Sequence, residues 1–580
     1  MRPRSVLLAV AAGLALADAS IVTLALPELL VDLDTTVQGV AAVIGVYTVV
    51  LALVLVPVER LAQAYGATRI GAAGFVTFAV ASLGCAVADS LPVLLAARSL
   101  QAAGGAAALV TTFSLLSDHD PESNPTHPPA TSARNLWLGA AVLSAALGPA
   151  LGGALTQAFS WPAIFLVNIP VALAAAGVCL TMDAPAARAA EPAPAAVAPG
   201  SATLLHDPPH TDWRAAAALG MVSAALSAVL FLLVLLLVAG WAVRPLAAAA
   251  TVTVVPLFAL AGSRLGGDAR WRAAAGCALV GLGTLALAFL PDARVAWTIA
   301  PQALAGFGMG LALPALGGEL LPERDARDAA RLLSIRHIGI AVALAVIAPI
   351  TAARLDDATF KARESGVALV LDAEINPTRK LQLAPALLAS VDAESPRAVL
   401  RKTIAENGDT LEGVERAEYD RLAARADETL VDAVGESFFA AFLITGLLAL
   451  GGAVLLVSTR LPPPTWAIGA AILGCVVLAA QVEEHHRRAP DPVPIADPCQ
   501  PRPQPATAGG GSLLDDLANG AQASALASID TEACQLGSSR EELLLAFVSD
   551  EDAERFEREH GTDARSVGGF LGSILRALVG

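Results

Sequence analysis

Stretches of about twenty apolar residues recur along most of this chain, and they limit its fold more than any other feature. A helix needs about 20 apolar residues to cross the hydrocarbon core of a bilayer. Backbone inside a bilayer must satisfy its hydrogen bonds internally, so each stretch is predicted to be a helix. Twelve stretches qualify, and a thirteenth candidate covers residues 465–482. The twelve lie near residues 5–27, 37–57, 69–88, 91–116, 136–157, 161–182, 215–240, 244–262, 272–290, 295–320, 332–352 and 437–459.

The composition excludes the common soluble classes. Hydrophobic residues make up 55% of the 580 residues, and charged residues only 16%, where a typical soluble domain has about 25%. The mean hydropathy of +0.63 is too high for a disordered chain. Six cysteines are too few for a disulfide scaffold. These values predict an all-α, multi-pass membrane protein.

The formal net charge of −16 is concentrated in two segments. Residues 353–436 carry 17 acidic and 11 basic residues, and residues 483–580 carry 17 and 8. The apolar remainder is nearly neutral, so we expect two water-exposed acidic modules attached to a membrane body. The chain has no concentrated basic face, which excludes a nucleic-acid partner.

The placement of arginine predicts the orientation, because cytoplasmic loops of membrane proteins collect Lys and Arg. With the N-terminus in the cytoplasm, the short external loops hold only Arg244 and Arg294. We interpret residues 5–27 as the first membrane helix and not as a signal peptide, because they include Asp18. We therefore expect a multi-pass protein of the cytoplasmic membrane with a cytoplasmic N-terminus. The short cytoplasmic segments then contain Arg60, Arg69, Arg134, Arg264, Arg270, Arg272, Arg324, Arg327 and Arg331.

The spans divide into two sets of six, separated by a Pro- and Ala-rich stretch that is typical of a linker. This predicts a bundle of two six-helix halves, as in transporters built from repeated bundles. The acidic insert would be helical and extracytoplasmic. The tail would carry a small helical module, for which Ser539-Arg540-Glu541-Glu542 supplies a capping box. The predicted parts are the first half (1–182), the cytoplasmic linker (183–213), the second half (214–459) with its insert (353–436), the candidate extra span (465–482) and the acidic tail (483–580).

Two ionisable side chains lie well inside predicted spans: Asp18 in the first and Arg98 in the fourth. An ionisable group within the bilayer is costly and is a functional candidate by default. A structural polar contact inside the bundle is the alternative interpretation for both residues. Glu319, Arg336 and His337 lie near helix ends, where long side chains reach the interface.

The fifth span contains Gly148-Pro149-Ala150-Leu151-Gly152-Gly153, in which Gly148 and Gly152 lie one turn apart on one face. Small residues there let two backbones approach, and Pro149 removes a backbone hydrogen bond and permits a kink. Ordinary helix packing and a moving hinge both fit this pattern.

Together these motifs resemble the major facilitator superfamily, and in particular its drug:proton antiporter branch. The run from Asp18 to Pro27, which includes Thr23, is similar to that branch's D-x-T-I-V-N-V-A-L-P signature. The stretch containing Arg98, Gln101 and Gly104 resembles its R-x-x-Q-G-x-G motif. The glycine run of the fifth span matches G-P-x-x-G-G. Further similarities are Trp161, Phe165, Asn168 and Pro170, and more loosely Arg336 in the second half.

The resemblance implies transport by alternating access, with Asp18 and Arg98 as the proton-coupling pair. It also implies that the run from Gly148 to Gly153 is a gating or hinge motif. The protonation of a buried carboxylate beside a guanidinium depends on the balance between desolvation and charge pairing, so a change of conformation can load and release the proton.

The loop between the second and third spans departs from the family's G-x-L-A-D-R-x-G-R-R pattern. Gln63 stands where the family has Asp, and Ala64 where it has the first Arg. In the family that Asp belongs to a charge network that holds the outward-open state. A glutamine keeps hydrogen bonding but loses the charge. The branch also usually has fourteen predicted spans, and its two extra central helices are missing here.

These observations predict a secondary active transporter that exports a hydrophobic or amphipathic small molecule, driven by inward proton flow. Its expected partners are the lipid bilayer, the substrate and protons. We expect no cofactor, no metal and no enzymatic activity, because no motif for these is present. The alternative is a transport-incompetent scaffold that binds cell-envelope partners through residues 353–436 or 483–580. Gln63 and the two acidic segments motivate that alternative.

The side of the membrane on which the tail lies decides the state of Cys499 and Cys534, the only cysteine pair in soluble sequence. If residues 465–482 cross, the tail is outside, where disulfides persist. A disulfide would then close a loop of 35 residues and contribute about 3–4 kcal/mol. If residues 465–482 lie along the interface, the tail is cytoplasmic and both thiols stay reduced. Apolar length favours crossing, whereas Arg487 and Arg488 favour the interface; we expect crossing.

Overall fold

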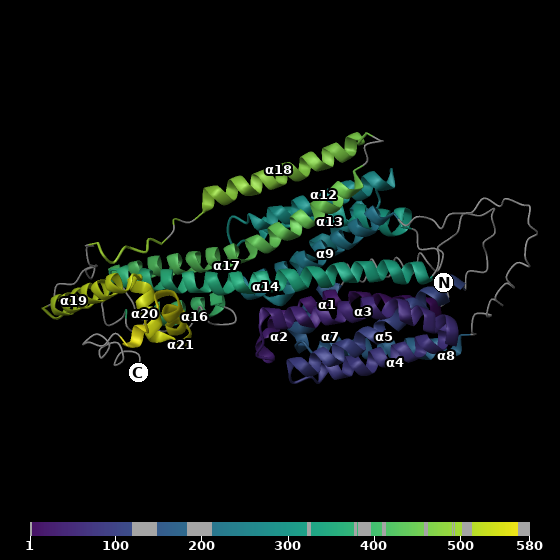
Figure 1. Ribbon diagram of the computed structural model, residues 1–580, viewed down its shortest axis with the longest axis horizontal. Helices are drawn as coiled ribbons and strands as arrows, with labels where there is room; N and C mark the ends of the chain where they lie inside the picture. The colour runs from purple at the N-terminus through teal and green to yellow at the C-terminus, as the bar shows by residue number, and fades with distance from the viewer. Residues whose placement is uncertain are drawn as a thin grey trace, which may run out of the picture. The chain divides into compact units, whose positions relative to one another are not determined.

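The computed structural model contains helices and no strand in the residues that it describes (Figure 1). The described residues are 3–118, 148–182, 212–321, 326–375, 380, 396–408, 413–457, 462–489, 491, 493–500 and 513–566. They form two compact units. The first comprises residues 1–238, 243–352 and 439–487, and the second residues 239–242, 353–438 and 488–580.

Twelve helices in the described part of the chain are long and apolar enough to cross a membrane. The chain is therefore a multi-pass membrane protein, as predicted. The fifth predicted span, 136–157, lies partly outside the described residues, and its part from residue 148 onward is helical. The twelve are α1 (Pro3–Thr23), α3 (Val37–Tyr65), α4 (Ala67–Ala86), α5 (Leu91–Asp118), α7 with α8 (Ala163–Leu166, Asn168–Thr181), α9 with η1 (Trp213–Leu235, Leu236–Gly240), α10 with α11 (Pro245–Val252, Val254–Gly262), α12 (Ala269–Ala288), α13 with η2 (Ala296–Pro314, Ala315–Leu320), α14 (Ala326–Asp372), α17 (Gly413–Leu456) and α18 (Thr465–Arg488).

Short polar residues begin several of these helices, because their side chains satisfy backbone N–H groups that have no partner within the helix. Thr36 accepts from Gly39 N at 3.2 Å before α3. Asp212 does the same for the first turn of α9, and Asp268 for α12. The short helix α2 (Leu26–Asp32) follows α1 directly and has Pro27 in its first turn.

The apolar core of the first unit contains two large buried clusters. One buried cluster joins α1, α3, α4, α5 and α8, and another joins α9, α12, α13 and α17. Glycine brings helices together in both: a Cβ on Gly104 would lie 2.5 Å from Phe78 N, and one on Gly276 would lie 2.6 Å from Ala312 N. The beginning of α14 contributes to both clusters, through Leu333 to the first and Leu332 to the second.

Helix α18 packs along α12 and α13 within the first unit. Its residues Trp466, Ala470 and Val477 lie against the cluster of Leu279, Leu304 and Leu311. A Cβ on Gly474 would meet the Leu282 side chain at 2.6 Å, so this glycine allows a close approach to α12. The predicted thirteenth segment is therefore a helix of 24 residues attached to the second half.

The second unit contains both acidic segments, which we expected as two modules. It includes the part of α14 from residue 353 onward and the part of α17 up to residue 438. It also holds α16 (Pro396–Gly408), α19 (Leu513–Leu536), α20 (Arg540–Val548), α21 (Asp550–His560) and η3 (Ala564–Ser566). Ser539 caps α20, as its capping box predicts, and Ser549 caps α21. Residues 381–395 of the insert lie outside the described residues, and its last part is helical within α17 from Gly413 onward.

Candidate functional site

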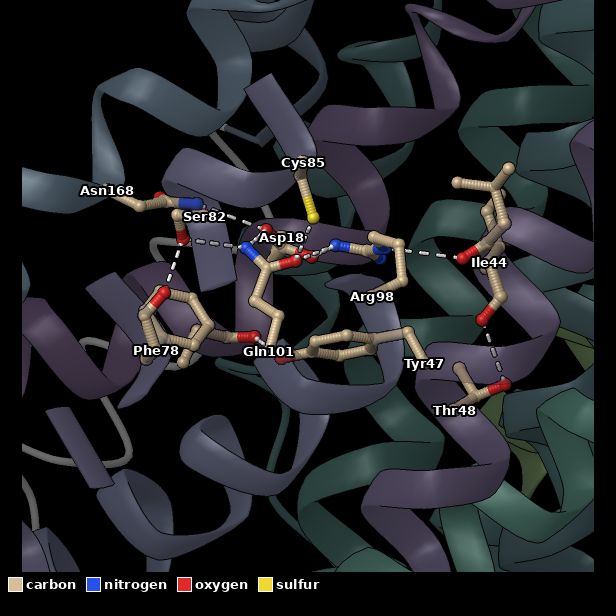
Figure 2. A network of polar contacts seen from close by, with 12 residues as sticks. Asp18, Ile44, Tyr47, Thr48, Phe78, Ser82, Cys85, Arg98, Gln101 and Asn168 are labelled. Carbon is tan, nitrogen blue, oxygen red and sulfur yellow. Dashed lines mark hydrogen bonds and ion pairs between the residues drawn. The ribbon is translucent and has the colours of Figure 1, made fainter. Parts of the chain in front are cut away.

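Asp18 and Arg98, 80 residues apart in sequence, form an ion pair inside the first half (Figure 2). Asp18 lies on α1 and Arg98 on α5, and their residues are 1% and 0% exposed. Arg98 Nη1 donates to Asp18 Oδ2. A buried guanidinium and carboxylate tolerate removal from water only when they pair and their remaining polar atoms are hydrogen-bonded.

Two amide side chains complete the environment of the carboxylate. Gln101 Nε2 donates to Asp18 Oδ1 at 3.3 Å, and Asn168 Nδ2 donates to the same oxygen at 3.2 Å. Arg98 Nη1 also donates to Gln101 Oε1 at 2.6 Å. The Gln101 amide therefore contacts both members of the pair (Figure 2). Asn168 comes from α8, so three helices meet at Asp18.

Four further residues orient Arg98 and Gln101. Arg98 Nε donates to Val43 O at 3.3 Å, and its Cζ lies 4.3 Å from the Tyr47 ring centroid, a cation–π distance. Ser82 Oγ accepts from Gln101 Nε2 at 2.9 Å, and Cys85 Sγ lies 3.6 Å from Gln101 Oε1.

Sequence reasoning missed Tyr47, Ser82 and Cys85. Ser82 and Cys85 lie three residues apart on α4, which puts them on one face, but such spacing is common in apolar helices. Tyr47 is one of only three tyrosines in the chain, and its ring carries a polar tip that donates to Ala15 O at 3.0 Å.

Two buried atoms of this cluster have no hydrogen-bond partner among the described residues. They are Arg98 Nη2 and Asn168 Oδ1. Arg98 Nη2 can donate a hydrogen bond and Asn168 Oδ1 can accept one. The cluster can therefore bind a water molecule or accommodate a rearranged side chain.

The glycine run of the fifth span packs on two neighbours. A Cβ on Gly152 would lie 2.4 Å from Ile21 O of α1, and one on Gly148 would lie 2.9 Å from Ser20 Cβ. A Cβ on Gly153 would lie 2.4 Å from Ala249 Cβ on α10, which belongs to the second half. Pro149 lies in the same helical segment. The run therefore joins the first span to the second half through contacts that leave no room for side chains.

The remaining predicted residues lie elsewhere in the first unit. Gly104 forms the close contact of α5 with α4. Thr23 is buried at the end of α1, five residues beyond Asp18. Pro27 lies in the first turn of α2, and Arg336 lies on α14.

Trp161, which the motif comparison singles out, is bound by two carboxylates of α2, the short helix that follows α1. Its backbone N–H donates to Glu28 Oε2 at 3.0 Å, and its Nε1 donates to Asp32 Oδ2 at 2.8 Å. Burial raises the pKa of Glu28, the Trp161 N–H lowers it, and the Asp32 charge raises it further; the net shift is upward.

Gln63, which stands where the family has an aspartate, follows a carboxylate, Glu59, by one helical turn. Gln63 Nε2 donates to Glu59 Oε1 on α3, and Glu59 is 1% exposed. Glu59 Oε2 lies 3.9 Å from Arg327 Nε at the start of α14. Ser334 Oγ of α14 also donates to Ala52 O of α3 at 2.9 Å. Charge and hydrogen bonding thus link α3 to α14, and so one half to the other.

Among the described residues, one group of side chains lies close enough together to share a metal ion. It consists of Glu542, Glu559 and His560 of the second unit. His560 Nε2 already lies 2.9 Å from Glu542 Oε1, which is an ordinary hydrogen bond or ion pair.

The profile of the Major Facilitator Superfamily matches residues 8–352. The chain belongs to this superfamily. The match covers both halves up to the point where α14 enters the second unit, and it confirms the resemblance that the motifs indicate.

Two relatives that resemble this chain carry names that refer to resistance. The methylenomycin A resistance protein of Streptomyces coelicolor is 32% identical over 256 residues, which is 43% of this chain and 49% of that protein. The tetracenomycin C resistance and export protein of Streptomyces glaucescens is 34% identical over 194 residues, or 32% of this chain and 35% of that protein. The chain thus spans about half or less of the length of these relatives.

A solved structure shares the fold. It is a bacterial homolog of the human lysosomal transporter Spinster in an inward-facing, occupied conformation, with a TM-score of 0.53 and 14% identity. The alignment covers 78% of this chain and 95% of that one. The predicted fold class, an all-α bundle of the major-facilitator type, is confirmed.

Proposed function

We propose that this protein is a proton-coupled exporter of a hydrophobic or amphipathic small molecule, working by alternating access in the cytoplasmic membrane. The observation that carries the proposal is the buried Asp18–Arg98 pair with Gln101 and Asn168 on the carboxylate. The Arg placement supports a cytoplasmic N-terminus.

The geometry supports a proton-binding role for Asp18. The charged carboxylate accepts from Arg98, Gln101 and Asn168. If Asp18 takes up a proton, Arg98 loses its ionic partner but keeps Gln101 Oε1, Val43 O and the Tyr47 ring. The two protonation states of Asp18 therefore favour different positions of the Arg98 guanidinium group. Coupling a proton to a conformational change requires such a difference.

The contacts of the glycine run support alternating access. Gly152 ties the fifth span to α1, which carries Asp18, and Gly153 ties it to α10 of the second half. A movement of one half against the other must pass through these contacts. The names of the relatives, which refer to resistance and export, support the outward direction.

The second half supports an uncharged or weakly polar substrate. Its fully buried polar side chains in the described spans are neutral hydroxyl and amide groups, among them Thr284, Thr298 and Gln302. The buried guanidinium of Arg272 is paired with Glu319. The hydroxyl and amide groups can form hydrogen bonds without presenting a fixed charge.

The alternative function, a transport-incompetent scaffold, is motivated by Gln63, which stands where the family has an aspartate. Glu59 weakens it, because this buried carboxylate lies one turn from Gln63 and faces Arg327. The large second unit remains an argument for a binding role in addition to transport.

The test is reconstitution of the full chain into proteoliposomes with an imposed pH gradient. We expect hydrophobic and amphipathic compounds to move against the proton flow, and a trapped pH dye to report proton movement when substrate is added. Flux that persists unchanged after the gradient is collapsed would contradict coupling. Absence of flux for every compound in a broad panel would favour the scaffold.

A further inference from the structure

The tail packs on the insert through a buried ion pair. Arg363 Nη2, on the outer part of α14, lies 2.6 Å from Asp552 Oδ2 on α21. The two side chains are 7% and 5% exposed, although 189 residues separate them in sequence. Either charge alone would be costly to bury, so the pair indicates that the two segments are built to lie together.

A second buried arginine joins the same segments. Arg540, at the start of α20, is 0% exposed and donates to Asp372 Oδ1 of α14 at 3.0 Å. It also donates to Glu541 Oε1 at 2.9 Å. The neighbouring cap residue Ser539 donates to Glu364 Oε1 at 2.6 Å while it accepts from Glu542 N.

Apolar contacts surround these polar ones. Val367 and Leu371 of α14 pack with Leu544 and Leu545 of α20. Arg555 of α21 lies 4.3 Å from the ring centroid of Phe360. The tail therefore packs on the part of α14 from residue 353 onward through both apolar and charged groups, as expected within a single domain.

The contacts between insert and tail require an even number of membrane crossings in the chain that connects them. Residues that share a compact core lie on the same side of the membrane, so the chain between them must cross an even number of times. The span in α17 is one crossing. Between α17 and the tail, the described residues contain one further helix long and apolar enough to span, α18, which must therefore cross as well.

The contacts of α18 support a membrane crossing independently of the insert and the tail. Trp466, near its start, lies within 3.9 Å of where a Cβ of Gly267 would stand, in the loop before α12. Near its end, Gln481 Nε2 donates to Trp297 O at 3.1 Å, and His485 Nδ1 lies 3.0 Å from Leu290 O, both beyond the end of α12. Helix α18 thus follows α12 from one end to the other, as a spanning helix does.

We infer that α18 is a further membrane-crossing helix and that insert and tail form a single extracytoplasmic domain built from two segments. The outside location follows from the Arg placement of the short loops. The disulfide between Cys499 and Cys534 of the tail fits that compartment, because disulfides persist in oxidising surroundings.

The first experiment determines the side of the tail in intact cells that produce the full chain. The cells are treated with a membrane-impermeant reductant and then with a membrane-impermeant maleimide. We expect labelling that depends on reduction and is absent from the C499S/C534S variant. A single cysteine placed in the linker of that variant (S201C) is the cytoplasmic control and should label only after lysis. Labelling of Cys499 and Cys534 only after lysis would overturn the inference.

The second experiment tests whether insert and tail form one domain, using an added protease on intact cells. The variants R363D and D552R each leave a buried charge facing a like charge, so we expect tail cleavage to be at least about tenfold faster. The exchange R363D/D552R should restore protection. Reversal of the exposed pair Arg416–Asp420 (R416D/D420R) is the matched control and should leave cleavage unchanged. Equal cleavage in all variants, with the tail outside, would overturn the single-domain part.

Discussion

The two halves of the membrane bundle pack in the same way but bury different chemistry. In each half, glycine lets one helix approach another: Gly104 does so for α5 on α4, and Gly276 for α12 on α13. The first half buries the Asp18–Arg98 ion pair. The fully buried polar side chains of the second half's described spans are neutral, and Gln302 Nε2 donates to Thr298 Oγ1 of its own helix at 2.9 Å.

This difference indicates a division of labour. Buried charge is costly in a membrane protein, and it is found where it does chemistry. The buried ionisable residues of the second half, Arg272 and His337, are 7% and 8% exposed, and Arg272 pairs with Glu319. The described spans of this half hold no ion pair as deeply buried as Asp18–Arg98, so we expect them to contribute less to proton dependence. The comparison therefore predicts that changes of polar groups in the first half alter proton dependence, and that matched changes in the second half do not.

The largest effect is expected for Asp18→Asn. Asparagine has nearly the same shape but cannot titrate, so pH-driven transport should fall to the level of protein-free liposomes. The protein should still fold, because Arg98 keeps Gln101, Val43 O and the Tyr47 ring. The measurement is uphill flux in proteoliposomes, with Asp89→Asn in an exposed loop as control. Wild-type coupling in Asp18→Asn would remove this residue from the mechanism.

A smaller effect on proton dependence is expected for Gln101→Leu than for the loss of Asp18. One donor to the Asp18 carboxylate disappears, so the charged form is less favoured and the midpoint of the pH–flux curve should move up by about one unit. Gln302→Leu is the matched control, because this equally buried amide bonds only within α13. Its pH–flux curve should keep the wild-type midpoint. Equal shifts in both variants would show that the halves do not differ in this respect.

The sequence predicts the local features of this molecule well. Apolar length locates the spans, because it is a property of consecutive residues. The pairing of Asp18 with Arg98 follows from the family motifs. The supporting residues Tyr47 and Ser82 could not be predicted, because their roles depend on which faces of α3 and α4 meet α5.

The union of insert and tail was also beyond sequence reasoning. Both segments are acidic, and like net charge suggests separate modules. The contacts that join them are made by a few buried arginines, Arg363 and Arg540, each placed against carboxylates of the opposite segment. The net charge of a segment does not show which of its individual charges pair with charges of another segment.

A third prediction tests the junction between the halves. Gly153→Ala adds a methyl group where a Cβ would lie 2.4 Å from Ala249 Cβ, so the fifth span and α10 must move apart. Overpacking of this kind costs about 1–3 kcal/mol, and it acts only in conformations that keep the contact closed. We expect transport to slow several-fold at unchanged pH dependence. Gly177→Ala on α8 is the control, because nothing lies within 4 Å of its Cβ position, and it should transport like the wild type.

The smallest effect is expected for Glu59→Gln, which removes the charge that faces Arg327 across the halves. The ion pair is long, at 3.9 Å, and Arg327 is 47% exposed, so solvent screens it and its contribution is at most about 1 kcal/mol. The link between α3 and α14 would still have the Ser334–Ala52 hydrogen bond. We therefore expect a shift of up to about fivefold in the ratio of the two access states, away from the one in which the end of α3 and the beginning of α14 are in contact. Spin labels on these two ends report that ratio as a distance distribution. Gln63→Asp should shift it in the opposite direction if a carboxylate at the family position strengthens the same contact. No shift in either variant would mean that hydrogen bonding and packing, without charge, hold the halves together at this end.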